Sequence, residues 1–180
     1  MRGYFGIGVE GTSKAANAGA VMRTAHAFGA SFVFAIAPET DVSAFRIADT
    51  SDTAKNLPLY TYPDVAALTL PKGCSLVGVE LMDNSVELPS FRHPRRAAYV
   101  LGPERGGLSP ALVARCDHVV KIPTRFSINL SLAAALVMYD RLISLERFAP
   151  RPEMPGGPAE PMPPHIHGAP QFRQRTKNDS

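Results

Sequence analysis

Polar, turn-rich loops follow two short apolar stretches of the chain, and they contain the side chains best suited to chemistry. Residues 97–101 run into the sequence Gly-Pro-Glu-Arg-Gly-Gly at 102–107, and residues 118–122 run into Pro-Thr-Arg-Phe-Ser-Ile-Asn at 123–129. Both apolar stretches have the character of short buried strands. In an open α/β sheet, ligands bind beyond the carboxyl ends of the strands, where loops place backbone groups near the ligand. The two loops therefore predict one binding site.

The first loop combines a fixed turn with an acidic side chain. Pro103 fixes one φ angle, and Gly106 and Gly107 permit positive φ. On these residues alone, the loop is equally an ordinary turn in which the carboxylate of Glu104 is solvated. It is not a dinucleotide-binding fingerprint, because no G-x-G-x-x-G sequence opens a helix here.

The second loop leads into a long apolar helix predicted at 129–148. Ser127 and Asn129 both suit the cap of this helix. The two roles are not exclusive, since Asn129 could start the helix while Ser127 faces a substrate. The helix carries an apolar stripe at helical spacing, made of Leu132, Ala135, Leu136, Tyr139, Leu142 and Ile143.

Asn17 and Arg23 are a third polar pair, on a helix predicted at 17–28. They lie six residues apart, which is roughly 600° of helical rotation, so they do not share a face. Asn17 suits the helix start, as an N-cap or in the loop before it, and Arg23 would project from the second turn. A cap and a solvated arginine explain both residues without any chemistry.

The elements around these motifs alternate between strands and helices. Further strands are predicted at 4–9, 31–36, 59–62 and 75–80, with a short helix at 64–70 and loops at 38–56 and 82–94. A helix between two strands indicates a βαβ unit. We therefore expect one α/β domain at 1–149, with a mostly parallel sheet of five or six strands and helices on both faces. Residues 150–180 include eight prolines and few large apolar residues, which predicts a disordered tail.

Composition narrows the class of partner. The formal charge is +3 and the pI is near 9.0, which permits a polyanionic partner, and Arg92, Arg95 and Arg96 lie within five residues.

No apolar run reaches the roughly 18 residues of a membrane span, and the first residues do not read as a signal peptide. Cys74 and Cys116 are too few for a disulfide framework, so reduced thiols in a cytoplasmic protein are expected. No Cys/His spacing indicates a metal site.

Taken in order, the three polar motifs resemble those of the SpoU/TrmH branch of the SPOUT RNA methyltransferases. The first is Asn17 followed six residues later by Arg23. The second is Gly-Pro-Glu-x-x-Gly-Leu at 102–108. The third is Ile-Pro at 122–123, followed by Ser-Ile-Asn at 127–129 and an Ala-rich helix. The resemblance covers about residues 3–148.

The resemblance implies a role for each motif residue. The implied catalytic residues are Asn17, Arg23, Glu104, Ser127 and Asn129. Glu104 would organise the site and its neighbouring arginines. The implied S-adenosylmethionine-binding residues are Val79, Gly102, Ile122, Ile128 and Leu130. Backbone groups at the last three would bind the adenine and ribose, Gly102 would let the cofactor approach the backbone, and Val79 would add an apolar wall.

The arginine is the residue whose role is hardest to assign. In relatives the arginine that matches Arg23 contacts RNA phosphate and is proposed to activate the ribose 2′-hydroxyl. A guanidinium with a pKa above about 12 is a poor general base at neutral pH. Arg23 could instead bind the phosphate beside the target ribose with its bidentate fork, or stabilise the developing alkoxide. The alternatives of base and electrostatic partner stay open.

The resemblance further implies an activity, partners and a topology. The activity is S-adenosylmethionine-dependent methyl transfer to a ribose 2′-hydroxyl of tRNA or rRNA, without a metal. The implied state is a homodimer with sites near the interface, in which Arg23 could act on cofactor held by the other subunit. The implied topology is a deep trefoil knot formed by residues 121–148, which sequence patterns alone would not suggest because knots are rare.

Two other hypotheses remain. A non-catalytic RNA-binding module of the same fold could serve in ribosome assembly, although the joint presence of Asn17, Arg23, Glu104 and Asn129 argues against it. A Rossmann-like enzyme of another class could use a nucleotide cofactor, although the missing glycine fingerprint argues against that.

Overall fold

The structure is a computed structural model that describes residues 3–40, 57–103, 106–146, 148, 151–152 and 155–156. Its contacts divide the chain into two units, 1–145 and 146–180. The first unit holds the sheet and its helices. The predicted tail at 150–180 lies almost wholly outside the described residues, so its disorder stays a prediction.

The first unit is built on one seven-stranded sheet in which every strand pair is parallel. The strand order is β3-β2-β1-β6-β4-β7-β5. The strands are β1 (Tyr4–Glu10), β2 (Phe32–Ile36), β3 (Leu59–Tyr62), β4 (Ser75–Val79), β5 (Val86–Glu87), β6 (Arg96–Leu101) and β7 (His118–Lys121). The predicted parallel α/β sheet is confirmed, with one strand more than expected because β5 lies in the segment 82–94 that was predicted as a loop.

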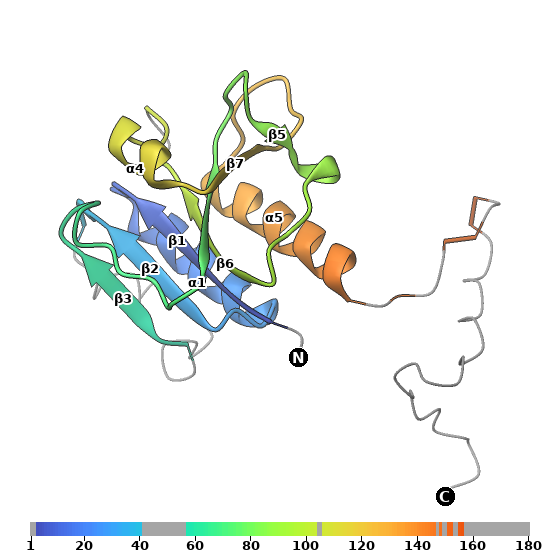
Figure 1. Cartoon of the computed structure of the whole chain (residues 1–180), viewed down its shortest axis with the longest axis horizontal. Helices are drawn as coiled ribbons and strands as arrows, with labels where there is room; N and C mark the ends of the chain where they lie inside the picture. Colours follow the sequence, from blue (N-terminus) through green and yellow to red (C-terminus); the bar gives the residue numbers. More distant parts are fainter. Residues whose placement is uncertain are drawn as a thin grey trace, which may run out of the picture. The chain divides into compact units, whose positions relative to one another are not determined.

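Helices cover both faces of the sheet, as predicted. Helices α1 (Ala15–Ala27) and α5 (Leu130–Leu145) pack against each other over one face, where they share a core with β1, β6 and β4. The short helix α4 (Pro110–Arg115) covers the other face with a smaller core. A 3₁₀ turn, η1 (Leu88–Ser90), precedes β6 (Figure 1). Among the described helices, none has the length and apolar character needed to span a bilayer.

Two local predictions are wrong. Helix α1 begins at Ala15 with Lys14 as its N-cap, so Asn17 lies inside the first turn and Arg23 in the third turn rather than the second. The alanines at 15 and 16 are strong helix formers and extend the helix past Asn17. Residues 64–70 form turns rather than a helix.

Hydrogen bonds explain why the segment 64–70 does not become helical. The Asp64 carboxylate accepts the Ala67 amide at 2.8 Å and closes a tight turn. Arg115 on α4 donates to the carbonyls of Val65 and Leu68. The Asp64 turn and the contacts with Arg115 together hold this segment in a non-helical shape, so a long-range contact overrides the local pattern.

The apolar stripe of α5 faces away from the core. Its buried side is formed by Leu130, Ala134, Val137, Met138 and Arg141. Leu132, Leu136, Tyr139 and Ile143 are between 37% and 59% exposed. The helix is therefore apolar on two sides, and the domain as it stands covers only one of them.

A buried polar cluster fixes α5 to the segment that leads into β6. Arg141 is 5% exposed, and its guanidinium donates to the carbonyls of Tyr4, Pro94 and Arg95 and to the Tyr99 hydroxyl. The guanidinium also lies over the ring of Phe5, 5.2 Å from its centroid. A buried cation is tolerated because several acceptors and an aromatic face replace water.

His93 completes this cluster. Its Nδ1 lies 2.6 Å from the Tyr99 hydroxyl, and its Nε2 lies 2.8 Å from Oδ2 of Asp140. A neutral ring satisfies both contacts when Tyr99 donates to Nδ1 and Nε2–H donates to Asp140. Burial lowers the pKa of His93, and the Arg141 charge lowers it further, although Asp140 acts in the opposite direction.

This environment predicts a pH-dependent stability. Because the folded pKa of His93 lies below its ordinary value of 6.5, the unfolded chain binds the proton more readily. The free energy of unfolding should therefore fall as the pH drops through about 6.5 towards the lowered pKa. Urea unfolding across pH 5–7.5 measures this fall. In His93→Gln the fall should shrink, whereas in His26→Gln, at an exposed site on α1, it should persist. An unchanged pH profile in His93→Gln would contradict the assignment.

Candidate functional site

A cleft opens at the carboxyl ends of β4, β6 and β7, between the two loops singled out in the sequence. Its empty volume is about 700 Å³ with the open mouth included. It is lined by Val79, Glu80, Leu81, Leu101, Gly102, Pro103, Gly106, Gly107, Ile122, Thr124, Ser127, Ile128, Leu130 and Ala133. Segments far apart in sequence thus meet at the edge where parallel sheets bind ligands.

The five residues expected to bind the cofactor all line this one cleft. They are Val79, Gly102, Ile122, Ile128 and Leu130. Ser127, expected to be catalytic, lines it as well. The structure therefore brings these six residues together, while their individual roles stay predictions.

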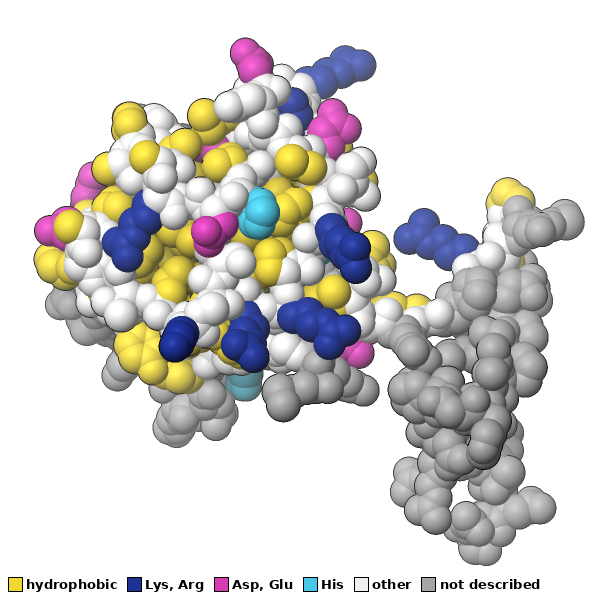
Figure 2. All heavy atoms as spheres, in the orientation of Figure 1, with side chains coloured by type: hydrophobic (Ala, Val, Ile, Leu, Met, Phe, Trp, Pro, Cys, Tyr) yellow, Lys and Arg dark blue, Asp and Glu magenta, His cyan; other side chains and the backbone are white. Residues whose placement is uncertain are grey.

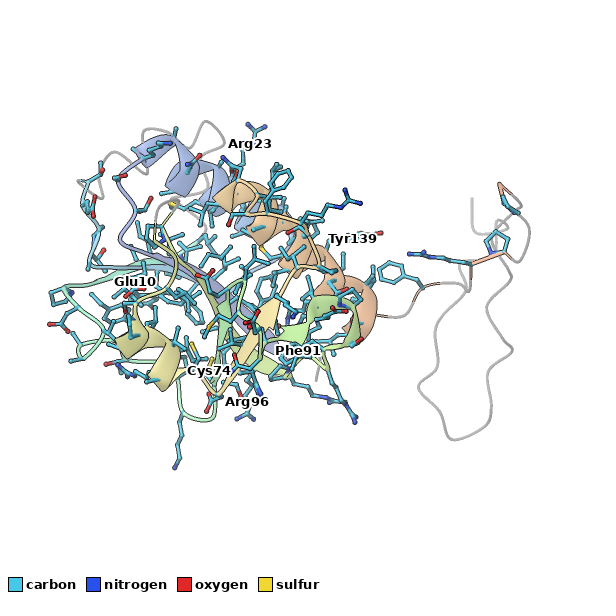
Figure 3. All side chains as sticks on the ribbon, turned by 90° about the horizontal axis from the view of Figure 1, so that it is seen from above. Glu10, Arg23, Cys74, Phe91, Arg96 and Tyr139 are labelled. Carbon is cyan, nitrogen blue, oxygen red and sulfur yellow. The ribbon has the colours of Figure 1, made fainter. Side chains whose placement is uncertain are left out.

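The other residues expected to be catalytic are placed differently. Asn129 is the residue before α5, and its side-chain oxygen accepts the amide and the hydroxyl of Ser131 at 2.9 and 2.7 Å, which makes it a helix cap. Asn17 and Arg23 lie on α1 and are not among the residues that line the cleft. Figure 3 shows Arg23 projecting outward from its helix. Glu104 lies outside the described residues.

The loop after β6 folds back closely on the strand. A Cβ built on Gly102 would lie 2.5 Å from the backbone of Gly107 and Leu108, so no side chain fits there. Gly106 and Gly107 adopt φ angles of 98° and 69°, which an L-residue rarely does. The glycines of this loop are thus required by its close packing and by its backbone shape.

Two glutamates at this edge were missed from the sequence. Glu80 lines the cleft, and its carboxylate accepts the amides of Leu81 and Leu108 at 2.9 and 2.7 Å. Glu10, 7% exposed, accepts the amide and the hydroxyl of Ser109 at 2.8 and 2.5 Å. A repeated Gly-Val-Glu sequence, at 8–10 and 78–80, was the signal that could have identified them.

The cleft is suited to binding a reactive group rather than to supplying one. Among its described lining residues only Glu80 carries a charge, and both of its oxygens already accept backbone hydrogen bonds. The two thiols lie outside the cleft lining, and burial raises the pKa of Cys116 to about 11 and that of Cys74 as well, so both disfavour the thiolate. Within the described ranges, no three His, Cys, Asp or Glu side chains gather as a metal would need.

The fold and this cleft define a parallel α/β protein whose ligand site lies between the loops after its central strands. The model of the SpoU rRNA Methylase family matches residues 5–139. The chain belongs to the SpoU rRNA methylase family.

One relative known by sequence is the tRNA (guanosine(18)-2'-O)-methyltransferase of Escherichia coli K12. It is 27% identical over 137 residues, covering 73% of this chain and 60% of the relative. The chain therefore spans about three fifths of the length of this relative.

Solved structures share the fold at lower identity. The SpoU methyltransferase AviRb of Streptomyces viridochromogenes, in complex with AdoMet, superposes with a TM-score of 0.69 at 23% identity, covering 79% of this chain and 58% of that one. A protein studied for the 2-OH methylation of C/U34 on tRNA gives a TM-score of 0.70 at 24% identity, covering 81% of this chain and 98% of that one. At these identities the likeness establishes the fold alone.

Proposed function

We propose that this protein is an S-adenosylmethionine-dependent methyltransferase that acts on a ribose 2′-hydroxyl of tRNA or rRNA. The observation that carries the proposal is the cleft, because one cavity gathers all five residues expected to bind the cofactor in a chain of the SpoU rRNA methylase family. The Escherichia coli relative, a tRNA 2′-O-methyltransferase, supports this substrate class.

The cleft has the chemical character that this cofactor needs. Val79, Leu101, Ile122, Ile128 and Leu130 offer apolar walls suited to an adenine ring. The glycines of the loop after β6 expose backbone groups that can bond polar atoms of the ribose and the amino-acid part. When bound, S-adenosylmethionine supplies an electrophilic methyl group, so the chain itself needs no nucleophile.

Residues of the chain then have to hold and activate the ribose. Ser127 lines the cleft and can donate or accept a hydrogen bond at its mouth. Arg23 would bind the phosphate next to the target ribose, or stabilise negative charge on the 2′-oxygen. Exposed arginines at 92, 95, 96, 115 and 125 add positive charge around the fold, and Figure 2 shows Lys and Arg side chains spread over one face.

A homodimer is part of the proposal. Arg23 does not line the cleft of its own subunit, so a second subunit would have to bring it to the reacting ribose. Leu132, Leu136 and Tyr139 leave an exposed apolar face on α5, and α5 packs beside α1, which carries Arg23. Covering this face with a second copy would bury apolar surface and bring the Arg23 helix close to the interface.

We also propose that residues 121–148 form a deep trefoil knot. The path of the chain supports it. From the end of β4 the segment 80–95 passes to β5, which pairs beyond β7, and then returns to β6 on the other side of β4. Helix α5 follows β7 and is bound to this segment by the hydrogen bonds of Arg141.

The compartment we propose is the cytoplasm, where tRNA and rRNA are accessible. Both cysteines are unpaired in the structure, which is compatible with a reducing compartment. The second candidate function, a non-catalytic RNA-binding module of the same fold, would need the basic surface but not the cofactor cleft.

Cofactor binding separates the two candidate functions. Calorimetry should show the protein binding S-adenosylmethionine, or its demethylated product, with one site per chain. Incubation with total RNA and labelled cofactor should then mark a ribose 2′-oxygen, and comparison with RNA from a strain lacking the gene should identify the nucleotide. RNA binding without any binding of either cofactor form would favour the non-catalytic module and overturn the proposal.

Arg23 provides a second test. Arg23→Ala should abolish methyl transfer with little loss of cofactor affinity, because Arg23 lies outside the cleft. Arg23→Lys should also be severely impaired, since lysine keeps the charge but lacks the planar fork. Arg92→Lys, at another exposed arginine, is the matched control and should retain turnover. Near-normal turnover of Arg23→Lys would reject a bidentate role.

The dimer is tested through its proposed interface. Leu136→Asp should give a monomer in analytical ultracentrifugation, because a charge in a buried apolar interface is costly. Methyl transfer should fall as dimerisation is lost, while the monomer should remain folded and keep its cleft. Val86→Asp, at a similarly exposed apolar residue on β5, should remain dimeric. A dimeric, active Leu136→Asp variant would exclude this face as the interface.

A further inference from the structure

The same tripeptide, Gly-Val-Glu, occurs at the carboxyl ends of both strands that flank β6. At 8–10 its Glu10 is the last residue of β1, and at 78–80 its Glu80 directly follows β4. The register is identical on both sides, because Gly8 and Gly78 both pair with Val100, and the valine that follows each of them pairs with Leu101. Glu10 and Glu80 therefore occupy equivalent positions on either side of Gly102, the first residue beyond β6.

Both glutamates point to the face of the sheet that α4 covers. Side chains alternate along a strand, so Glu10 lies on the side of Gly8 and Glu80 on the side of Gly78. A Cβ on Gly8 would touch Phe34, and one on Gly78 would touch Leu108 and Cys116, and these three residues belong to the core on the α4 face. The loop after β6 lies on the same face, between the two carboxylates.

Each carboxylate binds this loop through its backbone. Glu80 accepts the Leu108 amide at 2.7 Å from the β4 side. Glu10 accepts the Ser109 amide at 2.8 Å and the Ser109 hydroxyl at 2.5 Å from the β1 side. Ser109 is also the N-cap of α4, because its side chain accepts the Leu112 amide. Two neighbouring amides are thus held by two strands, and the start of α4 is fixed with them.

The loop packs tightly against the Glu80 carboxylate and against its own backbone. A Cβ on Gly107 would lie 2.5 Å from Oε2 of Glu80, the oxygen that accepts the Leu108 amide. A Cβ on Gly102 would meet the backbone of Gly107 and Leu108 at the same distance. Gly102, Gly106 and Gly107, held in this way, form part of the cleft wall.

We infer that Glu10 and Glu80 are positioning residues that clamp the loop after β6 in the shape that receives S-adenosylmethionine. Glu80 lines the cleft, but it acts through backbone hydrogen bonds rather than as a base, since Oε2 accepts the Leu108 amide of the loop and Oε1 accepts the amide of its neighbour Leu81. Glu10 is absent from the cleft lining and acts only through Ser109. The inference rests on the proposed function in one respect, the identity of the ligand.

Conservative variants test the clamp. In Glu10→Gln and Glu80→Gln the carboxylate becomes a neutral carboxamide, which has one acceptor oxygen in place of two and lacks the charge that strengthens the hydrogen bonds to the Ser109 and Leu108 amides, so the loop tethers weaken. If only about one tenth of the molecules hold the loop in the shape that binds S-adenosylmethionine, the apparent Kd for this cofactor rises about tenfold. Hydrogen exchange at the Leu108 and Ser109 amides should accelerate, while RNA affinity without cofactor stays within about twofold. Glu87→Gln, at an exposed glutamate ending β5, should change none of these.

A second variant perturbs the same contact from the loop side. Gly107→Ala pushes Oε2 of Glu80 away from the Leu108 amide, so it should reproduce the loss of cofactor affinity without removing a carboxylate. Combined with Glu80→Gln, its effect should be smaller than the product of the two single effects, because both break one contact.

The possible results are distinguishable. Wild-type affinity and unchanged amide protection in both glutamine variants would overturn the clamp. A parallel loss of RNA affinity and thermal stability would assign the glutamates to general folding and would overturn it as well. If the unaltered protein bound no S-adenosylmethionine, the proposed function would fail, and accelerated exchange at Leu108 and Ser109 would still support the clamp on the loop.

Discussion

Strand β6 is the constraint on which the rest of this structure depends. It lies between β1 and β4, its residues 97–101 are buried, and both neighbours run parallel to it in matching register. A strand buried on both faces requires an unbroken apolar run, so polar residues can begin only where the run ends. Parallel pairing then places the first polar residues of three strands at one edge. The loop after β6, the carboxylates of Glu10 and Glu80, and the cleft all lie at that edge.

The amino-terminal end of β6 is held just as firmly, by different chemistry. Arg141 binds the carbonyls of Pro94 and Arg95 just before the strand and that of Tyr4 on the neighbouring β1. His93 and Asp140 connect the segment before β6 to α5. Burial raises the pKa of Tyr99 to about 12, which keeps its hydroxyl a neutral member of this cluster. Helix α5 is thereby fixed relative to the sheet, and its first turn contributes Leu130 and Ala133 to the cleft at the opposite end.

The sequence predicted correctly those features that are set by residues close together in the chain, and it missed those that depend on contacts between distant residues. The apolar runs at 97–101 and 118–122, each followed by a polar loop, are local patterns, and they correctly predicted two strands whose loops meet at one cleft. The turns at 64–70 are held by the Asp64 carboxylate and by Arg115, about 50 residues away, so helical spacing was misleading there. Glu10 contacts Ser109 across 99 residues, and only the repeated Gly-Val-Glu sequence hinted at its importance.

Helix α5 shows a different limit of sequence reasoning, and one that bears on function. It is apolar on two sides, so periodicity alone could not tell that Val137 and Met138 face the core while Leu136 and Tyr139 face outward. In the proposed dimer, the outward side of α5 would form the interface. The cleft holds no arginine among its described lining residues, and Arg23 stands on the helix beside α5. A chain that binds the cofactor in one subunit and presents the cation from another would transfer methyl groups only when assembled, and in the proposed dimer the burial of the second apolar side of α5 would favour that assembly.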